Sequence, residues 1–162
     1  MNDETNIALY AFRTFGDTVL RAAYACFGSY HEAEDITQEV FLTLHGQPRT
    51  FSSDEHLKAW LLRCTINRCR NYIKSGRVRL STFLEGADEL PDNSSDRQDT
   101  EIREKVAGLP EKYRSVIHLY YYEGYNIREI AEMNEMSENT VSSLLRRGRQ
   151  KLKLELEKED KL

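Results

Sequence analysis

The sequence predicts an all-α protein made of two small helical domains joined by a flexible acidic linker. Apolar residues recur at helical intervals through most of the 162 residues, and no alternation of apolar and polar residues predicts a strand. The exception is segment 81–100, STFLEGADELPDNSSDRQDT, which offers too little apolar surface to offset its ordering entropy. We therefore expect domains over residues 1–78 and 101–162 and a linker over residues 79–100.

The first domain is expected to open with a helical stretch from Asn6 to Phe27. Its spacing fits either one helix or two helices broken near Gly16. The apolar positions that define this spacing are Leu9, Phe12, Val19, Leu20, Ala23 and Phe27.

The next helix is predicted over YHEAEDITQEVFLTLH. Ser29 and Glu32 precede and open it at the spacing of a capping box, and Gly46 follows it as a C′ residue. The predicted core face consists of Ala33, Ile36, Val40 and Leu44, with Phe41 beside it. The opposite stripe consists of Asp35, Gln38, Glu39 and Leu42, which is polar except for the leucine.

A third helix, DEHLKAWLLRCTINRCRNYIKS, follows the loop GQPRTFSS, with Ser52 and Glu55 as a second capping pair. Its predicted core face consists of Leu57, Trp60, Leu61 and Cys64, and shifts later to Cys69, Tyr72 and Ile73. A polar and basic stripe is predicted on the other side from Lys58, Arg63, Asn67, Arg70, Asn71 and Lys74. Such a stripe suits a phosphate backbone followed over several turns.

The second domain is predicted to begin with a short helical segment that contains Ile102 and Val106 and ends at Gly108. Pro110 then starts the helix PEKYRSVIHLYYYE, which ends at Gly124 as a C′ residue. The two remaining helices, IREIAEMN and SENTVSSLLRRGRQKLKLELEKE, are predicted with caps at Asn126 with Glu129 and at Ser137.

These last two helices have the pattern of a helix-turn-helix, with Ala131 on the inner face of the first. The expected packing partners are Ile127, Ile130, Met136, Val141 and Leu145. The surface left exposed carries Ser137, Glu138, Asn139, Thr140, Ser142, Ser143, Arg146, Arg147 and Arg149. Polar side chains near the helix N-terminus can reach base edges and the arginines suit phosphates or guanine, so the segment predicts DNA binding. A solvated basic helix is the alternative.

Charge is segregated along the chain, although the net charge is −4. Residues 58–79 contain basic side chains and no acidic one, residues 85–104 are mainly acidic, and residues 144–153 are again basic. Local charge of this kind, and not net charge, predicts contact with nucleic acid.

Several classes of function are not expected. No window approaches the roughly 18 apolar residues of a membrane helix, and the N-terminus lacks a secretory signal, so a cytoplasmic protein without membrane insertion is predicted. Cys26, Cys64 and Cys69 form no CxxC motif and are read as reduced core residues. His31, His45, His56 and His118 are scattered, so we expect no enzyme, no metal and no cofactor.

Three segments in order, AEDITQEVFLTLH, WLLRCTINRCRNYIK and LPEKYRSVIHLYYYEGYNIREIAEMNEMSENTVSSLLRRGRQKL, resemble the extracytoplasmic-function (ECF) sigma factors of the bacterial sigma-70 family. The resemblance covers nearly the whole chain. It implies a protein that directs promoter-specific transcription initiation, with a sigma-2-like first domain and a sigma-4-like second domain. The implied partners are core RNA polymerase, at its β′ clamp helices and β flap, and promoter DNA; an anti-sigma factor is left open.

The resemblance also implies roles for individual residues. Docking on the β′ clamp helices falls to Asp35, Gln38, Glu39 and Leu42, an acidic and amide face that suits an Arg-rich partner. Recognition and opening of the −10 element fall to Phe51, Lys58, Arg63, Asn67, Arg70 and Asn71. Recognition of the −35 element falls to the exposed surface of the helix-turn-helix. The acidic linker would pass near the nascent RNA, and a solubilising spacer is its alternative.

Two aromatic residues and several departures from the family pattern refine this picture. Phe51 would stack on a flipped base or face the core, and Trp60 is expected in the core.

Among the departures from the family pattern, Glu135 stands where a Gly is usual, so either Asn134 or Glu135 must adopt the left-handed backbone conformation of the turn. The other departures are Ser142 and Leu144 for Lys and Arg, Gly148 for Ala, and Asn71 and Lys74 for Asp and Arg. They predict a weak −35 readout and leave a local salt bridge in doubt.

The alternative function is a stand-alone dimeric helix-turn-helix regulator whose first half senses a ligand or dimerises. Such a regulator would need a dimer to match two half-sites and would bind duplex DNA without polymerase. The first domain offers no obvious ligand pocket, which favours the sigma factor.

Overall fold

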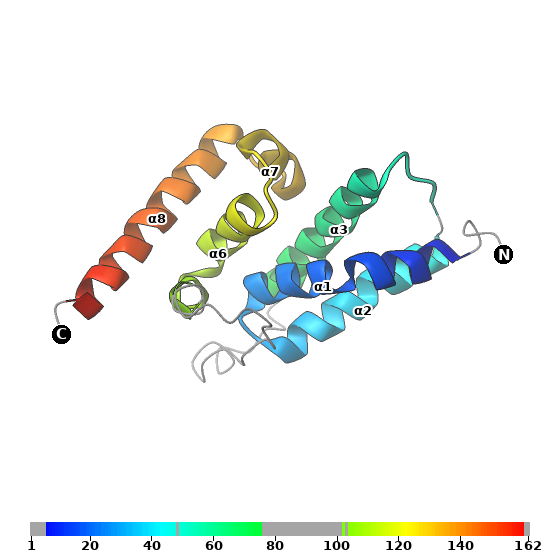
Figure 1. The fold of residues 1–162 in the computed structure, drawn as a ribbon, viewed down its shortest axis with the longest axis horizontal. Helices are drawn as coiled ribbons and strands as arrows, with labels where there is room; N and C mark the ends of the chain where they lie inside the picture. Colours follow the sequence, from blue (N-terminus) through cyan, green and yellow to red (C-terminus); the bar gives the residue numbers. More distant parts are fainter. Residues whose placement is uncertain (1–5, 48, 76–101, 103, 161–162) are drawn as a thin grey trace. The chain divides into compact units, whose positions relative to one another are not determined.

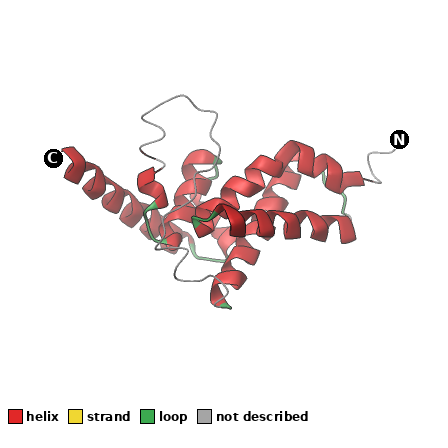
Figure 2. Ribbon diagram, turned by 90° about the horizontal axis from the view of Figure 1, so that it is seen from below, coloured by secondary structure: helices red, strands yellow, loops and turns green. Residues whose placement is uncertain are grey.

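The computed structural model describes residues 6–47, 49–75, 102 and 104–160, and the predicted linker lies outside them. The chain divides into two compact units. The first holds α1 (Ile7–Phe27), α2 (Tyr30–Gly46) and α3 (Asp54–Lys74); the second holds α6 (Glu111–Ile117), the π-helical turn η2 (His118–Tyr122), α7 (Ile127–Asn134) and α8 (Glu138–Asp160) (Figure 1). Helices are the regular elements throughout these residues (Figure 2), which confirms the all-α, two-domain prediction.

Helix α1 is continuous, so the break near Gly16 does not occur. It ends at Gly28, whose φ of 68° is left-handed and whose N–H donates to the carbonyl of Tyr24 at 2.7 Å. Of the apolar positions that define its spacing, Leu9 and Phe12 are exposed, to 37% and 54%. The buried positions of this helix are Ala11, Val19, Ala22, Ala23, Cys26 and Phe27.

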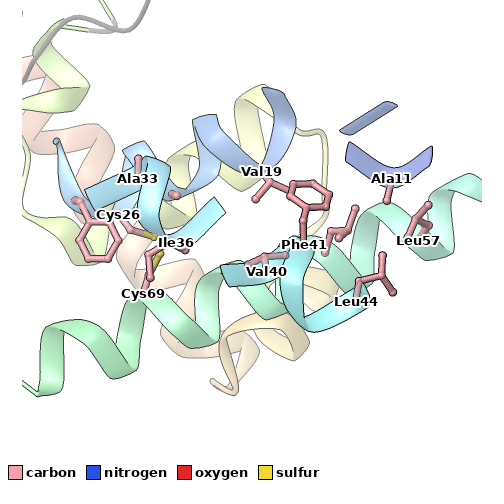
Figure 3. Packing of buried hydrophobic residues seen from close by; sticks show 13 residues of the cluster. Ala11, Val19, Cys26, Ala33, Ile36, Val40, Phe41, Leu44, Leu57 and Cys69 are labelled. Atoms are coloured by element: carbon pink, nitrogen blue, oxygen red, sulfur yellow. The ribbon is translucent and has the colours of Figure 1, made fainter. Parts of the chain in front are cut away.

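The core of the first unit lies between the three helices, and α2 contributes the predicted face (Figure 3). Ala33, Ile36, Val40 and Leu44 are at most 1% exposed, which confirms that face. Burying a side chain the size of Ile36, Val40 or Leu44 stabilises a fold by about 1.5–3 kcal/mol. From the third helix, Leu57, Leu61 and Cys69 join the cluster, and Trp60, Cys64, Tyr72 and Ile73 pack against it from partly buried positions.

Three of the predicted helix ends in this unit are wrong in detail. Ser29 precedes α2, but its hydroxyl donates to the Glu32 carboxylate instead of accepting a backbone N–H. Gly46 is the last helical residue and not a C′ residue. The N-cap of α3 is Ser53, one residue beyond the predicted Ser52, and its hydroxyl accepts the His56 N–H at 3.1 Å.

The second unit keeps most of its predicted caps. Asn126 and Glu129 form the predicted capping box of α7, with bonds of 2.8 and 3.1 Å, and Gly124 has a left-handed φ of 77°. Pro110 is the N-cap of α6 and not its first helical residue, and the helix then widens into η2. Val106 is buried, whereas Ile102 is 38% exposed. No helix in the described part of the chain is both long and apolar enough to cross a membrane.

Candidate functional site

The turn between α7 and α8 is built around a left-handed residue, Glu135, with φ 54° and ψ 45°. Asn134 does not take this conformation, because it remains helical and its side-chain amide donates to the carbonyl of Ile130 at 2.9 Å. The N–H of Met136 donates back to the carbonyl of Ala131 at 2.9 Å and closes the turn. Of the two alternatives at this position, the structure therefore selects Glu135.

Ser137 caps α8, as predicted. Its hydroxyl accepts the N–H of Thr140 at 3.1 Å, and the two hydroxyls lie 2.8 Å apart. The cap fixes the first turn of α8, where backbone N–H groups remain available to an anion.

The inner face of the helix-turn-helix contains the predicted residues. Ile130, Ala131, Val141 and Leu145 are buried, whereas Ile127 and Met136 are partly buried. Met133 is also buried and was not predicted. These contacts hold α7 and α8 together and leave the other side of α8 to solvent.

The exposed face of α8 has a clear centre. At about 100° per residue, Asn139, Ser142, Ser143, Arg146 and Gln150 fall within an arc of about 100°. Ser143 is partly buried and the other four are exposed. Glu138 and Arg149 flank this arc on one side, and Thr140 and Arg147 on the other, and all four are exposed. The sequence analysis did not include Gln150 in this face. Its position seven residues, or about two helical turns, after Ser143 is the signal that could have placed it there.

Two departures from the family pattern lie away from this face. Leu144 is 9% exposed and packs on the inner side. Gly148 is buried against α6, where an added Cβ would lie 2.8 Å from Cδ1 of Ile117 and 3.3 Å from Cβ of Tyr113. Both residues therefore act in packing, and the expectation that they weaken DNA readout is not supported by their positions.

Arg149 is drawn toward the edge of the exposed face. Its Nε donates to the carbonyl of Leu145 at 3.2 Å, and its guanidinium lies 6.0 Å from the ring centre of Tyr121. Arg146 and Arg147 are exposed as well, and neither makes a contact of this kind among the contacts described.

The first unit presents a second exposed face, on α2. Asp35, Gln38, Glu39 and Leu42 fall within an arc of about 100° and are all exposed, Leu42 to 66%. Asp35 lies 3.9 Å from His31 on its own helix, and Glu39 lies 3.4 Å from Arg68 of α3. The face combines carboxylates, an amide and one apolar side chain.

The polar stripe of α3 differs from the predicted one at a single residue. Arg63, Asn67, Arg70, Asn71 and Lys74 fall within an arc of about 100° along the continuous helix. Lys58 lies about 180° around the helix from Asn67 and does not share this face. The count of steps between basic residues suggested one stripe, whereas their angular positions separate Lys58.

The loop before α3 is held by aromatic and polar contacts. The Phe51 ring lies edge-on to His56 and Trp60, with ring centres 5.1 and 5.7 Å apart. The backbone N–H of Ser52 donates to Nδ1 of His56 at 3.2 Å. Phe51 is thus half-buried in a cluster that packs on the core, which favours the core-facing alternative.

Arg49 is the functional candidate in this loop that the sequence did not single out. Its guanidinium lies 5.3 Å above the ring centre of Trp60, and the residue is exposed. Burial raises the pKa of the nearby Cys64 thiol, while Arg68, Arg49 and Arg63 act to lower it. The guanidinium groups of these three arginines therefore lie near enough to Cys64 to act on its thiol. Among the described residues, no group of three or more His, Cys, Asp or Glu side chains could hold a metal ion.

Comparison with known proteins decides the family. A family model described as Sigma-70 region 2 matches residues 11–79, and one described as Sigma-70, region 4 matches residues 99–152. The chain is 30% identical over 158 residues to the ECF RNA polymerase sigma factor SigW of Bacillus subtilis, covering 88% of this chain and 84% of that protein. The chain belongs to the ECF group of the sigma-70 family.

Further comparisons agree with this assignment. This sigma factor is 31% identical over 155 residues to the ECF RNA polymerase sigma factor SigE of Mycolicibacterium smegmatis, covering 87% of this chain and 58% of that longer protein. Its fold matches the sigma factor RpoE of Bartonella quintana, solved with the anti-sigma factor NepR, with a TM-score of 0.70 at 18% identity, covering 94% and 98% of the two chains.

The matched regions correspond to the two units. Region 2 takes in most of α1 and all of α2 and α3, and region 4 takes in α6, η2, α7 and α8 as far as residue 152. Sigma factors are non-catalytic transcription initiation factors that bind core RNA polymerase and promoter DNA. The sigma-factor interpretation therefore holds over the stand-alone regulator.

Proposed function

We propose that this sigma factor divides its task among three surfaces: α2 docks on core polymerase, α3 with its preceding loop holds the opened −10 element, and α8 contacts the −35 element. The observation that carries the proposal is the separation of charge within the first unit. An acidic and amide face lies on α2 and a cationic face lies on α3, so the opposite charges are carried by separate helices of one three-helix core. A positively charged partner on α2 and a negatively charged partner on α3 can thus be bound at the same time.

The docking surface consists of Asp35, Gln38, Glu39 and Leu42. Charge-assisted hydrogen bonds from arginines of the β′ clamp helices suit its carboxylates, and Leu42 adds an apolar contact at the centre. These four side chains project from a regular helix, whose backbone needs little rearrangement to bind.

The −10 surface consists of Arg63, Asn67, Arg70 and Asn71 on α3, with Arg49 in the loop. Basic side chains follow the backbone of a single strand, and planar groups stack on its unpaired bases. Phe51 supports the loop through the edge-on contacts of its ring with His56 and Trp60. Lys58 faces another side of α3, so we leave it out of this surface.

The −35 surface lies on α8, with Asn139, Ser142, Ser143, Arg146 and Gln150 at its centre. Helix N-terminal amides and the flanking Arg147 suit phosphates, while the amide and guanidinium side chains suit base edges in the major groove. Ser142 is small and neutral where the family often has a cation, so we expect the −35 contact to be weak.

We place this activity in the cytoplasm, together with polymerase.

The proposal is tested by transcription from a pool of genomic fragments with purified core polymerase, with and without this protein. New transcripts whose starts share two sequence elements a promoter's length apart are the expected result. If polymerase is not stimulated, and the protein instead shifts duplex DNA alone, the stand-alone regulator is restored and the proposal fails.

A further inference from the structure

Arg68 lies between the two surfaces of the first unit and belongs to neither of them. Its Nη1 lies 3.4 Å from Oε2 of Glu39, and its Nη2 donates to the hydroxyl of Thr43. That hydroxyl donates in turn to the backbone carbonyl of Glu39 at 2.8 Å. The guanidinium of α3 therefore closes a ring of contacts around one residue of the docking face on α2.

We infer that Arg68 is a positioning residue for polymerase docking, which holds the Glu39 carboxylate in the orientation that meets a cationic side chain of the polymerase. The inference rests on the proposed docking role of α2. A glutamate on an open helix face samples many side-chain conformations, and binding must restrict them. Contact with Arg68 restricts them before polymerase arrives.

Room remains for the incoming cation. Arg68 contacts one carboxylate oxygen, and an ionised carboxylate accepts hydrogen bonds at about four lone-pair sites. Beside it lies an open hollow of about 320 Å³, lined by Glu39, Arg68, Asn71, Tyr72 and Ser75. This hollow offers a long basic side chain a route toward Glu39 beside Arg68.

The fork shape of the guanidinium is central to this role. Arg68 reaches a carboxylate and a hydroxyl at once, on residues one helical turn apart. A lysine ammonium is a single point charge and does not match this geometry. Asp35, on the same docking face, has only the longer contact of 3.9 Å to His31 on its own helix among the ion pairs described, so it serves as an internal comparison.

The test is a double-mutant cycle on the affinity of the full chain for purified core polymerase. Arg68→Ala is expected to weaken binding by roughly 3- to 10-fold, the cost of ordering one free side chain. Adding Arg68→Ala to Glu39→Gln is expected to cause no further loss. Arg68→Lys is expected to fall between wild type and Arg68→Ala. Arg21→Ala, which removes an exposed arginine of α1 that belongs to none of the proposed surfaces and has no contact to Glu39 among those described, is the matched control and should bind core normally.

Each contrary outcome has a distinct meaning. Unchanged or tighter binding by Arg68→Ala overturns the inference, because Arg68 would then be idle or would compete with polymerase for Glu39. An equal loss in the Glu39→Gln background also overturns it, because Arg68 would act without Glu39. If Glu39→Gln alone leaves core affinity unchanged, the docking assignment of α2 fails first. Thermal unfolding of every variant, with Arg68→Gln as a second neutral replacement, excludes misfolding as the cause.

Discussion

The two units support their functional surfaces in different ways. In the first unit, the exposed faces of α2 and α3 are organised by side-chain contacts, such as Arg68 with Glu39 and His56 with Ser52. In the second unit, α8 is placed by the backbone, through a left-handed Glu135 and a close helix contact at Gly148. Side-chain substitutions in the first unit should therefore change binding before stability, and backbone substitutions in the second should change stability before binding.

The strongest test of this contrast reverses the charge of the docking face. Asp35→Arg combined with Glu39→Arg should lower the affinity for core polymerase by at least about 100-fold, because like charges would oppose each other across the interface. Both residues are exposed, so the fold should persist. Gel filtration of the variant with core polymerase, with circular dichroism of the variant alone, measures both effects.

A matched control carries the same change of net charge at exposed sites outside the docking face of α2. Asp17→Arg combined with Glu157→Arg should assemble normally with core polymerase. Normal assembly of the docking variant as well would mean that α2 does not carry the polymerase contact.

The second test removes the exposed arginines of α8. Arg146→Ala combined with Arg147→Ala should weaken transcription by at least about 30-fold from promoters that depend on their −35 element, since each substitution removes about 1 kcal/mol or more of DNA contact. Promoters that rely on the −10 element should be affected much less. Run-off transcription from two such promoters measures the ratio, and equal loss on both would mean that these arginines supply general charge only.

Much of this architecture could be predicted from the sequence. The core face of α2 and the caps at Asn126 and Ser137 follow from local spacing, because residues a few positions apart in the sequence keep that relation within the folded helix. The position of the left-handed residue was left open, because either Asn134 or Glu135 could adopt it. The side-chain bond from Asn134 to Ile130 decides between them, and it exists only once α7 has formed.

Other features of the site depend on contacts between distant segments. Arg68 and Glu39 are 29 residues apart, and no local pattern joins them. Arg49 lies over the ring of Trp60, which belongs to another element. Gly148 is required by its close approach to Ile117, which also belongs to another helix. The misplacement of Lys58 has a different cause: steps of three to five residues accumulate an angular error that a helical wheel reveals.

The third test concerns the helix contact at Gly148. Gly148→Leu should lower the free energy of unfolding by about 2 kcal/mol, because the space is already occupied by Ile117 and Tyr113. Gly148→Ala should have a smaller effect, since the gain of about 1 kcal/mol in helix propensity partly offsets the clash. Gly46→Ala is the control, because an added Cβ there meets no atom within 4 Å and should be neutral or stabilising. Urea denaturation gives all three values, and tolerance of Gly148→Leu would show that α6 and α8 pack loosely.

The smallest effect is expected at the turn of the helix-turn-helix. A left-handed conformation costs a residue with a Cβ about 1–2 kcal/mol, so Glu135→Gly should raise the free energy of unfolding by about 1 kcal/mol after the entropy gained by the unfolded chain is subtracted. The reciprocal substitution, Gly124→Ala, introduces the same penalty at φ 77°, where no neighbouring atom lies within 4 Å of the new Cβ, and should lower it by a similar amount. Opposite shifts of the urea midpoint in the two variants would establish that backbone conformation, and not side-chain contact, sets the stability of this unit. If both variants are destabilised instead, the Glu135 side chain stabilises the turn by its own contacts, and the contrast drawn between the two units is lost at that residue.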